Sequence, residues 1–289
     1  METIPRIIPN KNFLYLKLLV IARLAYLSVL IGRAWQICIG DFPIRTLLWD
    51  EKLLRNFIEN NIKISWQSYL QFSEEAIHYI LAFLSIFFII GALYTITSRD
   101  NSKTIYALTT CLIFCALLFW KEKSYQWAEL GEYGLQCITP LVYYYFSKNQ
   151  TLTVIFFYIL ILAAALTFAA HGIYALGILP TPALFLDMTL YLLPFNQEEA
   201  TWFLLGIGCL DIFAALGITL TYLRNVALLW MIFWGGITTL ARLSLIQAAP
   251  NLIIGIYENI HEVLVRISHF LLPLFIWLYA NKYKNLDEK

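Results

Sequence analysis

The chain has few charged residues. Asp, Glu, Lys and Arg make up 13% of its 289 residues, where a soluble domain carries about 25%. Hydrophobic residues make up 60%, and the mean hydropathy is +0.69. Apolar runs of about 20 residues, long enough to cross the hydrocarbon core of a bilayer, recur along the whole length. The composition therefore predicts a polytopic helical membrane protein whose surroundings are the lipid bilayer.

Several kinds of site lack their usual signals. The five cysteines lie in or beside apolar runs and form no C-x-x-C pair, which argues against a disulfide framework or a thiol redox centre. No H-x-x-x-H or H-x-x-E spacing is present, so no metal centre is predicted. A net charge of +1 gives no reason to expect a nucleic-acid partner. The first apolar run contains Arg23 and Arg33 without a small-residue cleavage pattern, so we expect it to remain as an anchor.

The apolar runs predict an all-α bundle, a single integral membrane domain over residues 1–289 with about eight spans. No repeat or soluble domain is evident. We expect the spans at 13–39, 76–96, 104–120, 127–146, 152–178, 201–222, 225–246 and 260–280.

Three shorter segments complete the chain. Residues 40–75 place Leu and Phe residues at roughly helical spacing between charges, which predicts an extracytoplasmic helix lying in the membrane interface. Residues 180–194 open with Pro180-Thr181-Pro182 and are too short to span, which predicts a half-helix. A short amphipathic piece at 252–257 precedes the last span.

Lysine and arginine set the expected orientation. Eight spans put both termini on one side, and the short loops of that side collect most of the basic residues. The positive-inside rule then predicts cytoplasmic N- and C-termini in an inner (plasma) membrane.

Ionisable residues within the apolar runs are the candidate functional groups, because a charge in hydrocarbon is costly and normally faces a bundle interior or cavity. With this topology nearly all of them fall in the outer half of the membrane. Acids, arginines and histidines there nearly neutralise each other, which predicts a polar pocket open toward the outer face. We assign catalytic roles to His171, Asp187 and Asp211, and substrate binding to Arg33, Glu129, Glu132, Arg242, Arg266 and His269.

Such a pocket suits a small or lipophilic, quinone-like substrate. His171 with Asp187 or Asp211 would exchange protons with ring oxygens, and Arg242 or Arg266 would stabilise an oxyanion. His171 and His269 are also compatible with haem ligation, although isolated histidines are more often hydrogen-bonded core residues. The sequence thus leaves the cofactor unknown: a quinone is compatible with the pocket, and haem is not expected. A membrane oxidoreductase is the expected kind of enzyme, if the protein is one.

Two non-enzymatic alternatives remain open. The Pro-x-Pro break beside a half-helix, with Asp211 near the midplane, is typical of proton-coupled transporters. The same polar groups could instead join helices in a scaffold subunit of a membrane-protein complex.

Two stretches carry a family resemblance. Residues 23–36, RLAYLSVLIGRAWQ, and residues 206–213, GIGCLDIF, resemble helices of DoxX-like membrane proteins. The resemblance covers about half of the chain and implies a four-helix core and a redox or quinone-related context. It assigns no catalytic residue. The long 40–75 segment and the additional spans depart from that family's pattern.

Overall fold

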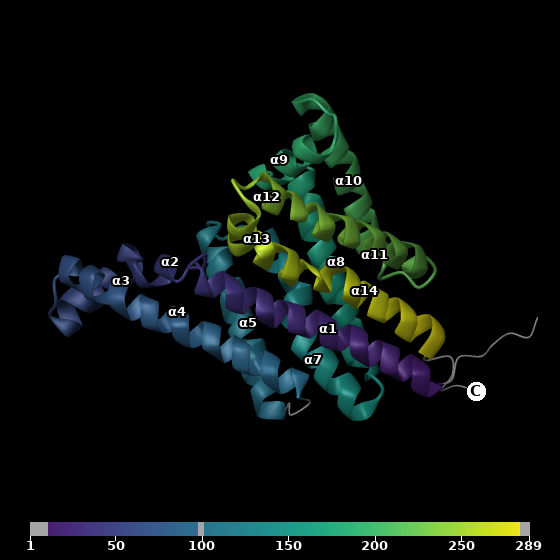
Figure 1. Ribbon diagram of the computed structural model, residues 1–289, viewed down its shortest axis with the longest axis horizontal. Coiled ribbons are helices and arrows are strands. Elements are labelled where there is room, and N and C mark those ends of the chain that lie inside the picture. Colours follow the sequence, from purple (N-terminus) through teal and green to yellow (C-terminus); the bar gives the residue numbers. More distant parts are fainter. Residues whose placement is uncertain (1–10, 98–100, 284–289) are drawn as a thin grey trace, which may run out of the picture.

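The computed structural model of the protein describes residues 11–97 and 101–283, which form helices and no strand (Figure 1). The prediction of an all-α bundle is therefore confirmed. The helices are α1 Lys11–Cys38, α2 Arg45–Leu48, α3 Glu51–Phe57, η1 Ile58–Ile62, α4 Trp66–Ile96, α5 Ser102–Glu122, α6 Trp127–Glu132, α7 Gly134–Asn149, α8 Val154–Ala175, α9 Ala183–Leu192, α10 Gln197–Gly217, α11 Arg224–Ala241, α12 Leu243–Ala248, α13 Leu252–Arg266, α14 Ser268–Leu278 and η2 Tyr279–Tyr283.

Seven helices of the described chain are long and apolar enough to cross a membrane, with α11–α12 and α13–α14 each counted as one. The segment from Trp127 to Asn149, predicted as a continuous span, is divided into α6 and α7. It still runs the length of the bundle. Tyr15 near the start of α1 contacts Ser147 near the end of α7, whereas Tyr174 at the end of α8 contacts Glu129 in α6. Eight crossings result. We call the end where α1 begins the terminal end, and the opposite end the site end.

Several predicted boundaries are wrong. The last span begins at Leu252 rather than 260, because the predicted amphipathic piece at 252–257 is the first part of α13. Asn251 caps that helix by accepting the N–H of Ile254. The span predicted at 201–222 instead runs from Gln197 to Gly217 and starts with a capping box between Asn196 and Glu199. The predicted half-helix is narrower than 180–194 and forms α9.

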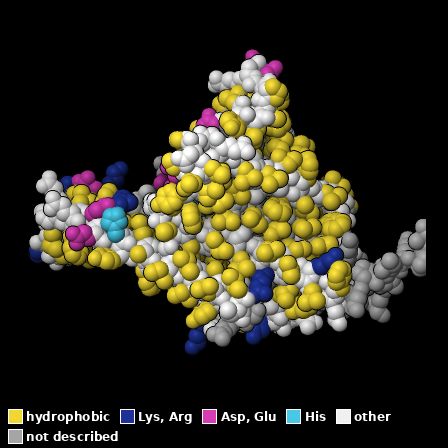
Figure 2. Space-filling model, in the orientation of Figure 1, with side chains coloured by type: hydrophobic (Ala, Val, Ile, Leu, Met, Phe, Trp, Pro, Cys, Tyr) yellow, Lys and Arg dark blue, Asp and Glu magenta, His cyan; other side chains and the backbone are white. Residues whose placement is uncertain are grey.

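Segment 40–75 forms a helical arm rather than one interfacial helix. It contains α2, α3, η1 and the first turns of α4, which begins at Trp66 instead of residue 76. Ser85 of α4 donates to the carbonyl of Ala34 near the end of α1, so about 15 residues of α4, roughly 22 Å at 1.5 Å per residue, extend beyond α1. The arm leaves the body at the left of Figure 1, and Figure 2 shows its charged side chains. Its extracytoplasmic side remains a prediction.

The surface of the body is mainly apolar, with Lys and Arg along the lower edge of the face in Figure 2. In lipid, burial of apolar surface does not drive helices together, so they associate by close packing. Gly172 of α8 and Gly208 of α10 provide such packing: a Cβ added to either glycine would lie 2.9 Å from the other's carbonyl oxygen. This contact holds His171 and Asp211 on facing helices.

Candidate functional site

A side chain inserted into the backbone ladder separates α6 from α7. Leu135 N–H would bond to the Gly131 carbonyl in a regular helix, but it donates to Thr167 Oγ1 at 3.2 Å. Thr167 Oγ1 in turn donates to the Gly131 carbonyl at 3.0 Å. Gly131 and Gly134 permit this approach, since a Cβ on them would lie 2.9 and 3.1 Å from backbone oxygens of α8. The break leaves Glu132 as the last residue of α6.

Two further helix breaks lie in the last part of the described chain. Arg242 separates α11 from α12, and Ile267 separates α13 from α14. Thr239 Oγ1 lies 2.6 Å from the Gly235 carbonyl of α11 and 3.1 Å from the Arg266 carbonyl of α13, so its hydroxyl can donate to either helix. Glu132, Arg242 and Arg266 therefore all stand at or beside helix breaks.

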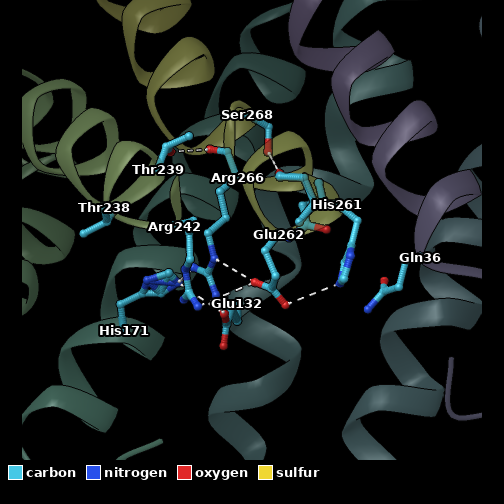
Figure 3. Close-up of polar contacts among 12 residues, drawn as sticks. Gln36, Glu132, His171, Thr238, Thr239, Arg242, His261, Glu262, Arg266 and Ser268 are labelled. Atoms are coloured by element: carbon cyan, nitrogen blue, oxygen red, sulfur yellow. Dashed lines mark hydrogen bonds and ion pairs between the residues drawn. The ribbon is translucent and has the colours of Figure 1, made fainter. Parts of the chain in front are cut away.

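Arg266 is the centre of the site (Figure 3). Its Nη2 donates to Glu132 Oε1 at 2.7 Å, and its Nη1 lies 3.3 Å from His171 Nε2. His171 Nε2 also lies 3.5 Å from Glu132 Oε1. A guanidinium can only donate, so Nε2 accepts from Arg266, which indicates a neutral imidazole protonated at Nδ1. Glu132 is then the nearest carboxylate that can give His171 a proton.

Glu262 and Arg242 lie beside this centre, as Figure 3 shows. Glu262 Oε2 lies 3.6 Å from Arg242 Nη1 and 3.8 Å from Arg266 Nε. These distances are too long for hydrogen bonds. Among the described residues, Arg242 Nε and Nη1 have no hydrogen-bond partner although the side chain is 3% exposed. Buried donors of this kind are normally satisfied by a bound molecule or by water.

His261 connects Glu262 to the protein surface. Its Nε2 lies 3.8 Å from Glu262 Oε1 and 3.1 Å from Asp41 Oδ2. The His261 side chain is 4% exposed and that of Asp41 is 61% exposed. The contact with His261 lowers the pKa of the Asp41 carboxyl, against the opposing effect of partial burial. Asp41 therefore keeps its negative charge at neutral pH.

Arg33 forms the wall on the side of α1. It donates to Gln36 Oε1, and to Gln136 Oε1 at 2.6 Å. Its guanidinium lies 5.0 Å from the ring centroids of both Phe119 and Tyr133, within the range of cation–π attraction. Arg33 is thus held by neutral partners and does not neutralise the acids directly.

Glu129 has hydroxyl partners. Tyr174 Oη donates to one carboxylate oxygen at 2.9 Å and Tyr133 Oη to the other at 3.2 Å. Glu129 and Glu132 share the polar cavity described below, but only Glu132 contacts an arginine at hydrogen-bond distance.

Two adjoining cavities surround these groups. The polar cavity, of about 250 Å³, is bordered by Asp41, Glu132, His261 and Glu262. The apolar cavity, of about 330 Å³, lies among α8, α9, α10 and α11 and is lined mostly by aliphatic and aromatic side chains. Both include Phe185, Arg242 and Arg266 in their walls. Arg242 and Arg266 therefore lie between the polar cavity and the apolar cavity and form part of the wall of each.

The structure brings most of the predicted site residues to these two cavities. Arg33, Glu129 and Glu132 line the polar one, His171 and Asp211 the apolar one, and Arg242 and Arg266 both. Asp211 is 2% exposed and accepts the indole N–H of Trp230 at 2.8 Å. It lines the apolar cavity, and within the described residues it forms no ion pair with Arg33, Arg242 or Arg266.

His269 and Asp187 occupy other positions. His269 is buried against His171, with ring centroids 5.3 Å apart, and lines neither cavity. Asp187 is exposed on α9 and lines neither cavity. Phe185, Met188 and Leu192 of that helix do line the apolar cavity, and their helical spacing places Asp187 on the opposite face.

Sequence reasoning missed two central residues. Neither His261 nor Glu262 was identified as a site residue, although His261 is buried and Glu262 lies beside Arg242. The signal was present in part, because Glu262 and Arg266 are four residues apart on one helix face. Placing the helix start at 260 hid it, since it put Glu262 in a fraying first turn.

The histidine geometry does not fit a haem. His171 and His269 meet edge to face at an interplanar angle of 65°, and their ring contact leaves no space for a macrocycle between them. Within the described ranges, no group of three or more His, Cys, Asp or Glu side chains is placed to hold a metal ion. The residues instead provide hydrogen-bond donors, titratable side chains that can exchange protons, and an apolar space.

Comparison of the chain with protein-family models, with curated proteins and with solved structures finds no match.

Proposed function

We propose that the protein binds a lipid-soluble molecule with an acceptor-bearing polar head, for which a quinone is the best-fitting class, and that His171 and Glu132 exchange a proton with that head. The observation that carries the proposal is the wall of Arg242, Arg266 and Phe185 shared by the polar and apolar cavities. An amphiphilic ligand would place its head at this wall and its tail in the apolar space.

The unpartnered donors of Arg242 support an acceptor at the wall. Its Nε and Nη1 lack hydrogen-bond partners in the described chain, and the side chain borders both cavities. A carbonyl oxygen of the ligand would satisfy these donors. Arg242 and Arg266 face two carboxylates, Glu132 and Glu262. This local balance favours a neutral head over an anion, because an anion would leave the buried cluster with excess negative charge.

The apolar cavity supports a lipid-soluble tail. Its volume of about 330 Å³ is within the range of about 300–1,000 Å³ that ligand pockets occupy. Phe203, Ile207 and Trp234 are among its lining residues. They lie on helices long and apolar enough to cross a membrane, so a ligand dissolved in the bilayer could enter from the side.

The proton-exchanging pair supports a redox-linked role. Quinone chemistry requires a proton donor or acceptor near a ring oxygen, and His171 borders the apolar cavity with Glu132 Oε1 3.5 Å from its Nε2. The resemblance to DoxX-like proteins favours the same redox context, which we retain as a proposal. A membrane oxidoreductase is the corresponding enzyme class.

We also propose that the terminal end faces the cytoplasm of a bacterial-type inner membrane. Four basic residues in the first or last two turns of helices at that end support this orientation: Lys17, Lys103, Lys148 and Arg224. The site end, with the arm, would then be extracytoplasmic.

Binding of decylubiquinone to the protein in lipid nanodiscs tests the proposed function. Ile207→Trp fills the apolar cavity and should weaken binding about tenfold or more, which corresponds to the loss of about 1.4 kcal/mol. Leu210→Trp is the matched control, because Leu210 is 44% exposed on the same helix and lines no cavity.

A second matched pair tests the head. Arg242→Gln removes the unpartnered donors and should also weaken binding about tenfold or more. Arg45→Gln changes an arginine of the arm, whose partner is Glu74, and should leave binding within about twofold. Extraction of bound lipid from the purified protein, followed by mass spectrometry, identifies the natural ligand. Absence of saturable quinone binding in the wild type would refute the proposal and favour the transporter or scaffold alternatives.

A further inference from the structure

Five titratable residues form a series from the protein surface to the apolar cavity. In order they are Asp41, His261, Glu262, Glu132 and His171. We propose that the polar cavity is a water-filled proton path that connects the aqueous phase beside Asp41 to His171, and through it to the ligand. The ligand as the proton's destination rests on the proposed function; the path itself does not.

The outer half of the path has one short contact, between Asp41 and His261, and one gap, between His261 and Glu262, which is too long for a hydrogen bond and needs a bridging water. Asp41 Oδ2 lies 3.1 Å from His261 Nε2, and the latter lies 3.8 Å from Glu262 Oε1. Asp41 is exposed, and the neighbouring cavity residues Glu122 and Lys123 are exposed as well. The polar cavity therefore reaches the surface at this point, where bulk water can give or take a proton.

Water must carry the proton through the middle of the path. Arg266 lies between Glu262 and Glu132, and a guanidinium does not release its protons in proteins. Both carboxylates nevertheless border the same polar cavity of about 250 Å³. A polar cavity needs a volume of only about 10–15 Å³ to hold one water molecule. Several waters can thus connect Glu262 to Glu132 around the arginine.

Glu132 and His171 complete the path. Their closest atoms, Oε1 and Nε2, are 3.5 Å apart. A proton that reaches Glu132 from water passes to His171 Nε2, while Glu132 is protonated again from the cavity. No electron moves in this step. The charged and titratable groups that face the pair are Glu129, Arg242, Glu262, Arg266 and His269.

Hydrogen–deuterium exchange of the histidine ring protons tests the path without any ligand. The chain has four histidines, so selective isotope labelling gives an NMR spectrum that single His→Gln variants can assign. His78, with a side chain 68% exposed, is the fast reference. His269 lines neither cavity and is the slow reference. In nanodiscs transferred to D₂O, His171 should exchange much faster than His269.

Variants at both ends of the path sharpen the test. Glu132→Gln removes the last carrier and should slow exchange at His171 about tenfold or more. Asp41→Asn combined with His261→Gln removes the two titratable groups at the entrance and should have the same effect from a region away from the ion pair. Glu122→Gln, a polar change at the cavity mouth outside the series, should leave the rate within about twofold. Unchanged His78 and His269 resonances establish that the variants are folded.

The outcomes separate the path from the proposed function. Exchange at His171 as slow as at His269, or exchange unaffected by both blocking variants, overturns the path even if decylubiquinone binds. Fast, variant-sensitive exchange in a protein that does not bind decylubiquinone establishes the path and refutes the proposed function.

Discussion

Two adjacent glycines of α11 provide a sharp test of how the site is held together. A Cβ added to Gly235 would lie 2.8 Å from the carbonyl oxygen of His269 and 3.1 Å from its carbon, whereas a Cβ on Gly236 would meet nothing within 4 Å. Pro273 contributes to this arrangement, because it has no N–H to bond to the His269 carbonyl four residues earlier. Gly235 thus allows α11 to approach the backbone of α14 beside the site.

The magnitudes follow from these distances. The contact made by Gly235→Ala would be 0.6 Å shorter than the 3.4 Å at which ordinary contacts begin. Backbone atoms on both sides must move, and we expect a loss of about 1–3 kcal/mol in the free energy of unfolding. Gly236→Ala places its methyl group in open space and should stabilise the helix by about 0.5–1 kcal/mol. The two variants should therefore differ by roughly 1.5–4 kcal/mol.

Unfolding by sodium dodecyl sulfate in mixed micelles, followed by circular dichroism, measures this difference. The NMR signal of His269 should shift in Gly235→Ala and remain in place in Gly236→Ala. Equal stability of the two variants would refute the packing of α11 against α14, and with it the placement of Arg242 beside Arg266.

Three further predictions use the same unfolding assay. Glu132→Gln and Arg266→Gln should each lower the free energy of unfolding by about 3–5 kcal/mol, because each leaves a buried charge unpaired. The double variant should lose clearly less than the sum of the two single losses, and additive losses would contradict a direct ion pair. Thr167→Val should cost about 1–3 kcal/mol by leaving Leu135 N–H and the Gly131 carbonyl without their shared partner, while Thr167→Ser should retain most of the stability; equal losses would indicate a packing role. Because the pKa of Asp41 is lowered in the folded state, its stabilisation should be fully present above its unfolded pKa of about 3.9 and disappear as the pH falls through its folded pKa. The stability difference between wild type and Asp41→Asn, measured from pH 7 down to pH 2–3 or so, should accordingly decline with acidification, and a difference that grows would contradict the assignment.

The spans were predictable because apolar length is a strong signal. Their ends were less so. The start of α4 at Trp66 depends on Ser65, whose side chain accepts the N–H of Ser68, and on arm contacts such as Trp49 to Ser73. Between residues 66 and 75 the sequence is too polar for a span and equally suits an interfacial helix. Tertiary contacts, rather than local composition, determine that one helix continues through it.

Most residues of the site were predictable from the sequence, because charged residues within apolar runs stand out. Ionisable residues within apolar runs must gather, and Glu132, Arg242 and Arg266 do lie together. Asp187 was misplaced because its depth was considered without its helix face, although the spacing of Phe185, Met188 and Leu192 defines that face. The break at Tyr133 had no local signal, since it depends on Thr167 from another helix.

The position of the helix breaks distinguishes a binding site from structural contacts between helices. Polar side chains can join continuous helices in a membrane, so a scaffold requires no interruption of the backbone ladder. Here Tyr133, Arg242 and Ile267 interrupt three crossings, and each stands at or next to a charged residue of the cavity walls. Backbone groups released within a membrane must find new partners, which Thr167 and Thr239 provide. Irregular backbone is tolerated at this depth where it is buried in protein or lines a cavity. The breaks coincide with the buried donors of Arg242 and with the shared wall of the two cavities, which agrees with the ligand that we propose at this junction.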